Sequence, residues 1–373
     1  MHRGLQIPTQ RSVAEASGVS RAAVGAILSG GTAAARYSAE TRERVLAAAR
    51  RLHYRPNRAA QAMRKQRSNL VAIVHFGAGI EAAHKTNQAL SRELNVAGFD
   101  YLAVDMNWYG GSVERTLEEL IQARVEGVLI SHIQEVFGDE HVEVLRQAGI
   151  PVVSINGERR KNVSLICDTA AKAITELTSH LLAQGHRHLV QLLPSMGAGN
   201  SGSRVHRDRR SGFASAFSAT GRWMQVAEED FSMDLFNGEE ALGITVTQDS
   251  RQYELLERPV YQFCRRLLAA GNCPDAIVCS NDTYAVEAIM AAVELGLSVP
   301  GDLAVTGYDN DRIGEFPAMG LTTAEQDLHG ICTTGVRTLI ERINNPVLPT
   351  TTKSFDSKLI IRSSCGSATS QIP

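Results

Sequence analysis

Polar side chains directly follow several short apolar runs of this sequence, at positions where they could bind a small polar molecule. In open α/β sheets, ligands bind beyond the carboxyl ends of the strands, so the residues that follow a strand are the first candidates for a binding site. Asp and Asn at such positions also cap the next helix, and a capping role is the alternative for each of them. This rule selects His75, Phe76, Asn107, Asp168, Asn281, Asp282, Asp309 and Asn310.

The motifs that would indicate catalysis, a metal or a cofactor are incomplete. Segment 197–202 reads Gly-Ala-Gly-Asn-Ser-Gly, but it lacks the lysine of a phosphate-binding loop and the full GxGxxG pattern. His186 and His188 are two residues apart with no third ligand nearby, which makes a poor metal site. The six cysteines lie far apart without a CxxC pair, so they predict buried free thiols. Because a nucleophile elbow and a credible acid/base pair are also missing, we expect no enzyme activity, no metal and no cofactor.

The pattern from Leu70 onward predicts the elements that would position the polar residues. Short apolar runs alternate with amphipathic segments, which is typical of parallel sheets in α/β layers. The body is too long for one sheet, so we predict two doubly wound parallel-sheet lobes that face each other across a cleft. The predicted strands are Leu70–His75, Tyr101–Val104, Val128–Ser131, Val152–Ile155, Leu189–Leu193, Ala276–Cys279 and Leu303–Thr306. The predicted helices include Ala83–Ala97, Val113–Ala123, Ala170–Gln184 and Tyr284–Leu295.

Charge divides the 373 residues into a basic head and an acidic body. The first seventy residues hold 13 of the 38 Lys and Arg residues but only three of the 40 acidic residues, so the head carries +10 and the rest carries −12. Clustered Lys and Arg neutralise phosphates, which predicts a polyanionic partner for the head alone. No stretch approaches the roughly 18 apolar residues of a membrane-spanning helix, and charged residues occupy the place of a signal peptide. We therefore expect a cytoplasmic protein with no membrane partner.

The head has the pattern of a helix-turn-helix. Thr9 can cap a first helix that ends at Gly18, and Ser20 can cap a second. A third helix is predicted over Ala39–Leu52, where apolar residues form one stripe, and a short Ala-rich helix is predicted after Pro56. The small, glycine and apolar residues that lock the first two helices together are Ala14, Gly18, Val19, Val24 and Ile27.

The run from Thr9 to Val74 resembles the start of a repressor of the lactose-repressor/galactose-repressor (LacI/GalR) family. The blocks "SVAEASGVSRAAV", "SAETRERVLAAARRLHYRPNRAAQAMR" and "LVAIV" occur in the order of that family. The resemblance implies that the second helix enters the DNA major groove and that a hinge helix folds on operator binding. It also implies a DNA-binding domain over residues 1–54, a hinge over 55–69 and an effector-binding, dimerising body over 70–373.

The resemblance also implies which residues contact DNA. Arg21, Ala22 and Ala26 occupy base-reading positions, and Met63 occupies the position of an apolar wedge for the minor groove. Arg21 can pair with O6 and N7 of guanine, whereas an alanine can only touch a thymine methyl group. The family usually shows Thr-Val-Ser-Arg where this chain has Ala-Val-Gly-Ala over 23–26, so phosphate and base contacts are missing there. The expected DNA-binding residues are Ser20, Arg21, Ala22, Ala26, Tyr54, Asn57, Arg58 and Met63.

The body resembles the effector-binding part of the same family, which is similar to periplasmic sugar-binding proteins. The blocks "VEGVLIS", "GIPVVSIN", "RRSGF" and "LTTAEQDL" recur in order. The resemblance implies that Arg209 grips the effector, that Asp309 binds its hydroxyls, and that Asn281 and Asp168 are further polar groups of the pocket. A carboxylate that accepts from two vicinal hydroxyls beside the planar fork of an arginine suits a sugar or another polyol, with purines as the alternative. The expected effector residues are His75, Phe76, Asp168, Arg209, Asn281 and Asp309.

Three features of the body depart from the family pattern. Stretch 219–274 is longer and less recognisable than a compact member needs, and "DTAAKA" replaces the usual residues after Asp168. The end of the chain, Ser363–Pro373, lacks the leucine heptads of a tetramer-forming coiled coil. We expect a homodimer, because one symmetric protein must read two half-sites.

The function predicted from the sequence is a transcription regulator, with repressor as the first choice. It would read the two half-sites of a pseudo-palindromic DNA operator under the control of a small-molecule effector. A solute-binding protein and a sugar-modifying enzyme on the same two-lobed body are the alternatives. The basic head argues against the first, and the missing catalytic motifs argue against the second.

Overall fold

The computed structural model divides the chain into two compact units, Met1–Asn69 and Leu70–Pro373, which are described separately below. In the described part of the chain, no helix is long and apolar enough to cross a membrane. The predicted hinge over 55–69 lies mostly outside the described residues and stays a prediction. The structure describes residues 8–55, 67–75, 81–106, 112–131, 137–195, 204–218, 231–232, 259–269 and 274–366.

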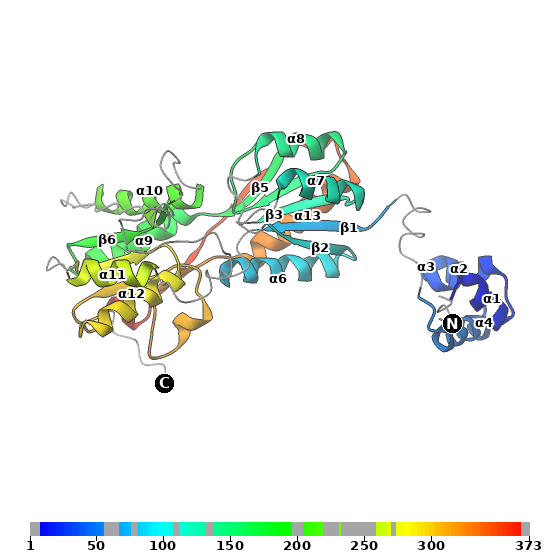
Figure 1. Cartoon of the computed structure of the whole chain (residues 1–373), viewed down its shortest axis with the longest axis horizontal. Helices are drawn as coiled ribbons and strands as arrows, with labels where there is room; N and C mark the ends of the chain where they lie inside the picture. The colour runs from blue at the N-terminus through cyan, green and yellow to red at the C-terminus, as the bar shows by residue number, and fades with distance from the viewer. Residues whose placement is uncertain are drawn as a thin grey trace, which may run out of the picture. The chain divides into compact units, whose positions relative to one another are not determined.

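The first unit is a helical head, labelled α1 to α4 in Figure 1. Thr9, Ser20 and Ser38 each accept a hydrogen bond from the backbone N–H three residues further on, and these bonds begin three of the helices. Gly18 ends the first helix with φ 67°, a left-handed conformation that favours glycine. The helices are α1 (Gln10–Ser17), α2 (Arg21–Ser29), α3 (Gly31–Ala34) and α4 (Ala39–Arg51). Their shared core consists of Val13, Val24, Ile27, Val45, Ala48 and Ala49.

The second unit contains two lobes, and the first lobe is built on a six-stranded parallel sheet. Its strand order is β12-β5-β4-β3-β1-β2. One apolar cluster packs α7 and α8 against one face, and a second cluster packs α6 and α13 against the other. The strands are β1 (Leu70–His75), β2 (Asp100–Asp105), β3 (Gly127–Ser131), β4 (Val152–Ile155), β5 (Val163–Asp168) and β12 (Thr352–Phe355). The helices are α6 (Glu81–Val96), α7 (Val113–Gln122), α8 (Asp139–Gln147) and α13 (Leu328–Asn344).

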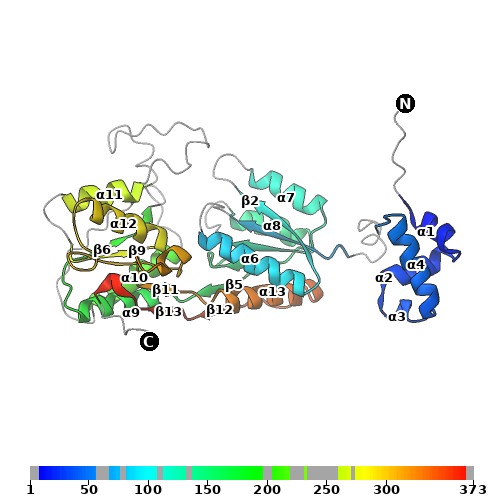
Figure 2. The ribbon, with the colours of Figure 1, turned by 90° about the horizontal axis from the view of Figure 1, so that it is seen from below.

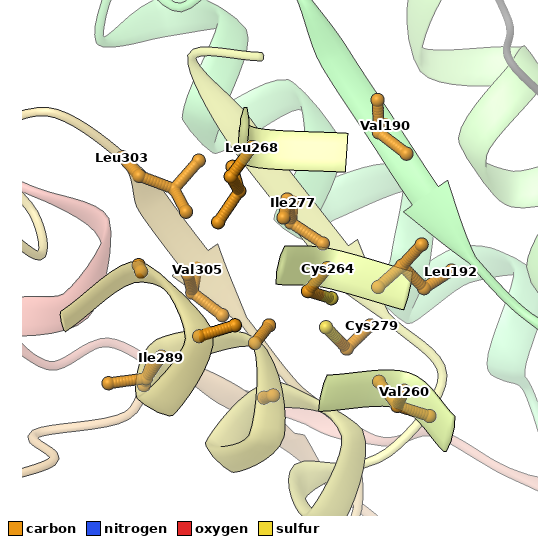
Figure 3. Packing of buried hydrophobic residues seen from close by; sticks show 14 of the residues in the cluster. Val190, Leu192, Val260, Cys264, Leu268, Ile277, Cys279, Ile289, Leu303 and Val305 are labelled. Atoms are coloured by element: carbon orange, nitrogen blue, oxygen red, sulfur yellow. The ribbon is translucent and has the colours of Figure 1, made fainter. Parts of the chain in front are cut away.

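The second lobe repeats this plan around a smaller parallel sheet of order β10-β9-β6. Helices α11 and α12 cover one face, and Figure 3 shows part of this cluster, including Cys264, Leu268 and Ile289. Helices α9 and α10 cover the other face. The strands are β6 (Leu189–Leu192), β9 (Ala276–Cys279) and β10 (Ala304–Thr306), and short two-stranded pairings join β7 (Pro194–Ser195) to β8 (Phe231–Ser232) and β11 (Thr323–Glu325) to β13 (Lys358–Ile360). The helices are α9 (Ala170–Ala183), α10 (Arg204–Ser218), α11 (Pro259–Ala269) and α12 (Asp282–Glu294).

The described chain passes between the lobes at three places. It leaves the first lobe between β5 and α9, returns between β11 and α13, and leaves again between β12 and β13. These crossovers run side by side along one side of the body in Figure 2. The two-lobed α/β fold with parallel sheets confirms the predicted fold class, while β5, β11, β12 and β13 were not among the predicted strands.

Candidate functional site

The carboxyl ends of the two parallel sheets face each other where the lobes meet. Asp168 is the last residue of β5 in the first lobe, and Tyr308 lies two residues after β10 in the second. The Tyr308 hydroxyl donates to Oδ2 of Asp168 at 2.6 Å, and it also lies 2.9 Å from the Oγ of Ser357. Ser357 lies between β12 and β13, so one buried hydroxyl contacts two of the three crossovers.

Arg209 of α10 is fixed by three different groups at this junction. Its Nη1 donates to the backbone oxygen of Ser280, and its Nη2 lies 3.8 Å from Oδ1 of Asp309. Its guanidinium carbon lies 4.1 Å from the centre of the Tyr308 ring, within the range of a cation–π contact. Only 6% of Arg209 is exposed, so an ion pair and an aromatic face replace the water that this cation has lost.

Asp309 is held in an unusual backbone conformation with φ 101°. Its backbone N–H donates to the oxygen of Ala324 at 2.7 Å, and its Oδ1 accepts from Nε2 of Gln326 at 2.6 Å. Burial raises the pKa of Asp309, while the charge of Arg209 and the bond from Gln326 act in the opposite direction. The carboxyl group is therefore fixed in place by groups that favour its ionised form.

A chain of hydrogen bonds returns from Asp309 to Asp168. Oε1 of Gln326 accepts from Nδ2 of Asn156 at 2.7 Å, and Oδ1 of Asn156 accepts from the backbone N–H of Asp168 at 2.9 Å. Since Tyr308 is bonded to Asp168 and precedes Asp309 in the chain, the network closes on itself. It links residues of both lobes, so a change in the hydrogen bonding of one carboxylate affects the hydrogen bonding of the other.

Several buried polar atoms at the strand ends and on α10 have no hydrogen-bond partner among the described residues. Oδ1 of Asp168 lies 3.7 Å from Nη2 of Arg204, which is an ion pair but too long for a hydrogen bond. Buried polar atoms in native proteins nearly always form hydrogen bonds, so a polar ligand or water must supply the hydrogen bonds that are missing here. The atoms are His75 Nδ1, Ser131 Oγ, Asp168 Oδ1, Arg204 Nη2, Arg209 Nε and Ser280 Oγ.

The structure brings together three of the predicted effector residues, whereas Asn281 and His75 make other contacts. Asp168, Arg209 and Asp309 are brought together, as described above. Asn281 begins α12, and its Oδ1 accepts from the backbone N–H of Tyr284 at 2.8 Å, which is the helix-capping alternative. Nδ1 of His75 lies 3.9 Å from Oδ1 of Asp105, and burial lowers the pKa of His75.

Phe76 lies outside the described residues. Four further residues of this junction were not among the residues predicted from the sequence: Tyr308, Gln326, Asn156 and Arg204. Tyr308 directly precedes the selected Asp309, and Gln326 and Asn156 lie in the blocks "LTTAEQDL" and "GIPVVSIN", so family resemblance offered a signal for all three.

The exposed face of the head surrounds a shallow hollow of about 490 Å³. Ser20 is used as a cap, with its side chain accepting from the N–H of Ala23 at 3.2 Å. Tyr54 packs against the core of the head, and its N–H donates to the oxygen of Ala49. Asn57, Arg58 and Met63 lie outside the described residues. The hollow is lined by Gln10, Arg21, Ala22, Gly25, Ala26, Ser29 and Ala33, which include the three predicted base-reading residues.

Comparison with known proteins assigns both units. Residues 9–57 match the model of the bacterial regulatory proteins of the lacI family. Residues 84–242 match the periplasmic binding proteins and sugar binding domain of the LacI family, and residues 178–365 match the periplasmic binding protein-like domain. The matches follow one another along nearly all of the chain.

Individual relatives match over nearly their full lengths. An uncharacterised HTH-type transcriptional regulator in the aml 5′ region of Streptomyces limosus is 29% identical over 371 residues, which are 96% of this chain and 94% of the relative. The solved structure of the lac repressor dimer bound to operator and the anti-inducer ONPF has a TM-score of 0.75 at 22% identity, covering 96% of this chain and 99% of that one. The structure of a complex of the transcriptional regulator CelR with cellobiose has a TM-score of 0.64 at 22% identity, with 96% and 99% covered. The chain belongs to the LacI family of bacterial regulatory proteins, and it is a DNA-binding transcription regulator, as the sequence analysis predicted.

Proposed function

We propose that this chain is a homodimeric repressor whose body binds a sugar or sugar derivative. Two copies of the head would bind the two half-sites of a pseudo-palindromic operator, because a two-fold symmetric site is matched by a two-fold symmetric protein. The similar solved structure of the lac repressor is a dimer bound to operator, which supports this assembly.

The arrangement of Asp168, Asp309 and Arg209 at the lobe junction carries the proposal for the effector. Two carboxylates accept hydrogen bonds from hydroxyl groups, and a guanidinium donates to hydroxyl or carbonyl oxygens. Oδ1 of Asp168 and Nε of Arg209 are buried without a hydrogen-bond partner in the described residues, so one acceptor and one donor are left for a ligand. A sugar offers both kinds of group on adjacent carbons. The cellobiose complex of the similar regulator CelR supports the same class of ligand.

On the DNA side, Arg21 is the proposed base-reading residue. It stands at the first position of α2, and Ala22 and Ala26 on the same helix can offer only methyl groups to DNA. A recognition helix with one long donor would specify one guanine in each half-site and leave neighbouring positions to shape and methyl contacts.

A thermal-shift screen of the full chain tests the effector proposal. The panel contains monosaccharides, disaccharides, sugar phosphates, polyols and nucleobases. A ligand present at 100 times its dissociation constant adds about 2.7 kcal/mol of stability, which is readily measured. We expect a hit among the sugars that also changes affinity for operator DNA. Stabilisation by nucleobases alone would overturn the sugar assignment.

A further inference from the structure

The first two turns of α6 in the first lobe contact the segment that follows β10 in the second lobe. Nζ of Lys85 donates to the backbone oxygens of Asp309 and Asn310 at 2.9 and 3.1 Å, and to Oδ1 of Asp311 at 3.1 Å. An ammonium group has three protons to donate, so these three oxygens satisfy it completely. Figure 2 shows the end of α6 beside this segment.

A second contact comes from the same face of the same helix. Glu81 lies four residues before Lys85, which places the two side chains one above the other on α6. Its Oε1 accepts from the backbone N–H of Arg312 at 3.3 Å, at the start of a short 3₁₀ helix, Arg312–Glu315. One turn of α6 therefore contacts four consecutive residues of the other lobe.

The contacted segment is firmly attached to its own lobe. Asp309 and Asn310 have φ values of 101° and 45°, a left-handed pair that orients their carbonyl groups. The backbone N–H of Asp311 donates to Oδ2 of Asp282 at 2.6 Å. Nδ2 of Asn310 donates to Glu325 at 3.1 Å. Lys85 is thus bonded to a segment that is firmly held by the second lobe and that carries the Asp309 carboxyl group.

The contacted segment is rich in carboxyl groups, which makes the positively charged lysine a favourable partner for it. Asp282, Asp309 and Asp311 are all buried, and the charge of Asp309 raises the pKa of both Asp282 and Asp311. Burial and the charge of Asp309 raise the pKa of Asp311 to about 6, while the hydrogen bond from Lys85 lowers it. The other lobe therefore supplies a cation, Lys85, to this acidic cluster, while the charge of Glu81 on the same helix raises the pKa of Asp311.

We propose that Lys85 and Glu81 form a clasp between the lobes that holds them together in the absence of effector and fixes the backbone that presents Asp309. The inference rests on the proposed function only in assigning Asp309 to the effector site. The clasp makes lobe separation, and through it effector affinity, depend on two side chains outside the Asp168, Asp309 and Arg209 group. Lys85 is in this sense a positioning residue.

The test measures lobe separation in the full chain without effector or DNA. Val96 on α6 is 81% exposed and Val293 on α12 is 61% exposed, so Val96→Cys and Val293→Cys place spin labels on opposite lobes. The native cysteines in the described residues are buried. Pulsed electron paramagnetic resonance then gives the distance distribution between the labels. Lys85→Met removes the ammonium group and keeps a similar side-chain length, and Arg92→Met is the matched control at an exposed position of the same helix.

We expect Lys85→Met to increase the population of separated lobes about tenfold, as the loss of one charge-assisted contact implies. Glu81→Ala should give a smaller increase, because its single bond is long, and Arg92→Met should give none. Circular dichroism shows whether each variant is folded, and Lys85→Leu, which also lacks a donor, replaces Lys85→Met if the latter does not fold. Unchanged distances in Lys85→Met or Lys85→Leu would overturn the clasp. The proposed function is tested separately, because its failure would show as a missing ligand response with the clasp intact.

Discussion

Replacing Asp309 by Asn should separate effector binding from stability. Asn keeps the shape of the side chain and an oxygen that can accept from Gln326, but it loses the charge that accepts strongly from two hydroxyl groups. Burial raises the pKa of Asp309, which means that the ionised carboxyl group lowers the stability of the folded protein. Neutralisation removes this cost and also removes the partner of Arg209, so we expect the melting temperature without effector to change little.

The effect on effector binding is much larger. Two hydrogen bonds from hydroxyl groups to a buried carboxylate are each worth roughly 1.5 kcal/mol or more, so their loss raises the dissociation constant about 150-fold. An effector at 100 times the original dissociation constant stabilises the parent by about 2.7 kcal/mol. At the same concentration it would stabilise the variant by only about 0.3 kcal/mol.

The assay is a thermal shift measured with and without the effector identified in the screen, followed by operator binding without effector. Asp302→Asn is the matched control, because Asp302 is exposed and its carboxylate only accepts from Ser298. We expect normal operator binding by both variants and loss of the effector response in Asp309→Asn alone. An effector shift in Asp309→Asn equal to that of the control would refute the assignment of Asp309 to the site.

Three further predictions concern the head and the buried junction. Arg21→Ala should relax the preference for one base pair in each half-site, measured by selection from random DNA, and an unchanged selected sequence would contradict the assignment of Arg21. Tyr308→Phe keeps the ring beside Arg209 but leaves Asp168 Oδ2 without its donor, so the free energy of unfolding should fall by about 2 kcal/mol in urea denaturation; a loss near zero would mean that water replaces the hydroxyl. Burial, with the nearby Asp309 and Asp311, raises the pKa of Asp282 from 3.8 to about 7, so the stability contributed by its protonated form is complete below about pH 4 and is lost as the pH rises to about 7. Asp282→Asn should remove that part of the pH dependence of unfolding, and identical pH profiles for parent and variant would argue against the raised pKa.

The sequence predicted local structure well where one short segment contains all the information. Thr9, Ser20 and Gly18 mark helix ends through bonds to residues within one turn, and the structure shows each of these caps. The strands β1, β3, β4, β6 and β9 were predicted because they are buried on both faces and appear as continuous apolar runs. Strand β12 was missed because its residues are mostly exposed at the edge of the sheet, where burial imposes no apolar pattern.

For the candidate site, the sequence likewise predicted individual residues but not the contacts between them. Asp168, Arg209 and Asp309 were selected by family resemblance, two of them also by their places near strand ends, but residue spacing alone does not bring them together. Asn281 was selected by the same strand-end rule, but in the structure its side chain caps helix α12. Whether an Asn after a strand caps a helix or faces a ligand depends on its side-chain direction, which one sequence does not specify.

By itself, the sequence determined that this protein has a basic helix-turn-helix head, an α/β body and membership of a family of transcription regulators. Those properties follow from charge counts, helix caps, the periodicity of apolar residues and blocks of family-like sequence, all of which are local or additive along the chain. Only the tertiary structure decided that Tyr308 joins two crossovers, that Gln326 and Asn156 close a network between the carboxylates, and that Lys85 reaches the other lobe. The bonds from Tyr308 to Asp168, from Asn156 to Gln326 and from Lys85 to Asp309 each join residues more than a hundred positions apart, and folding of the whole body determines which of them meet.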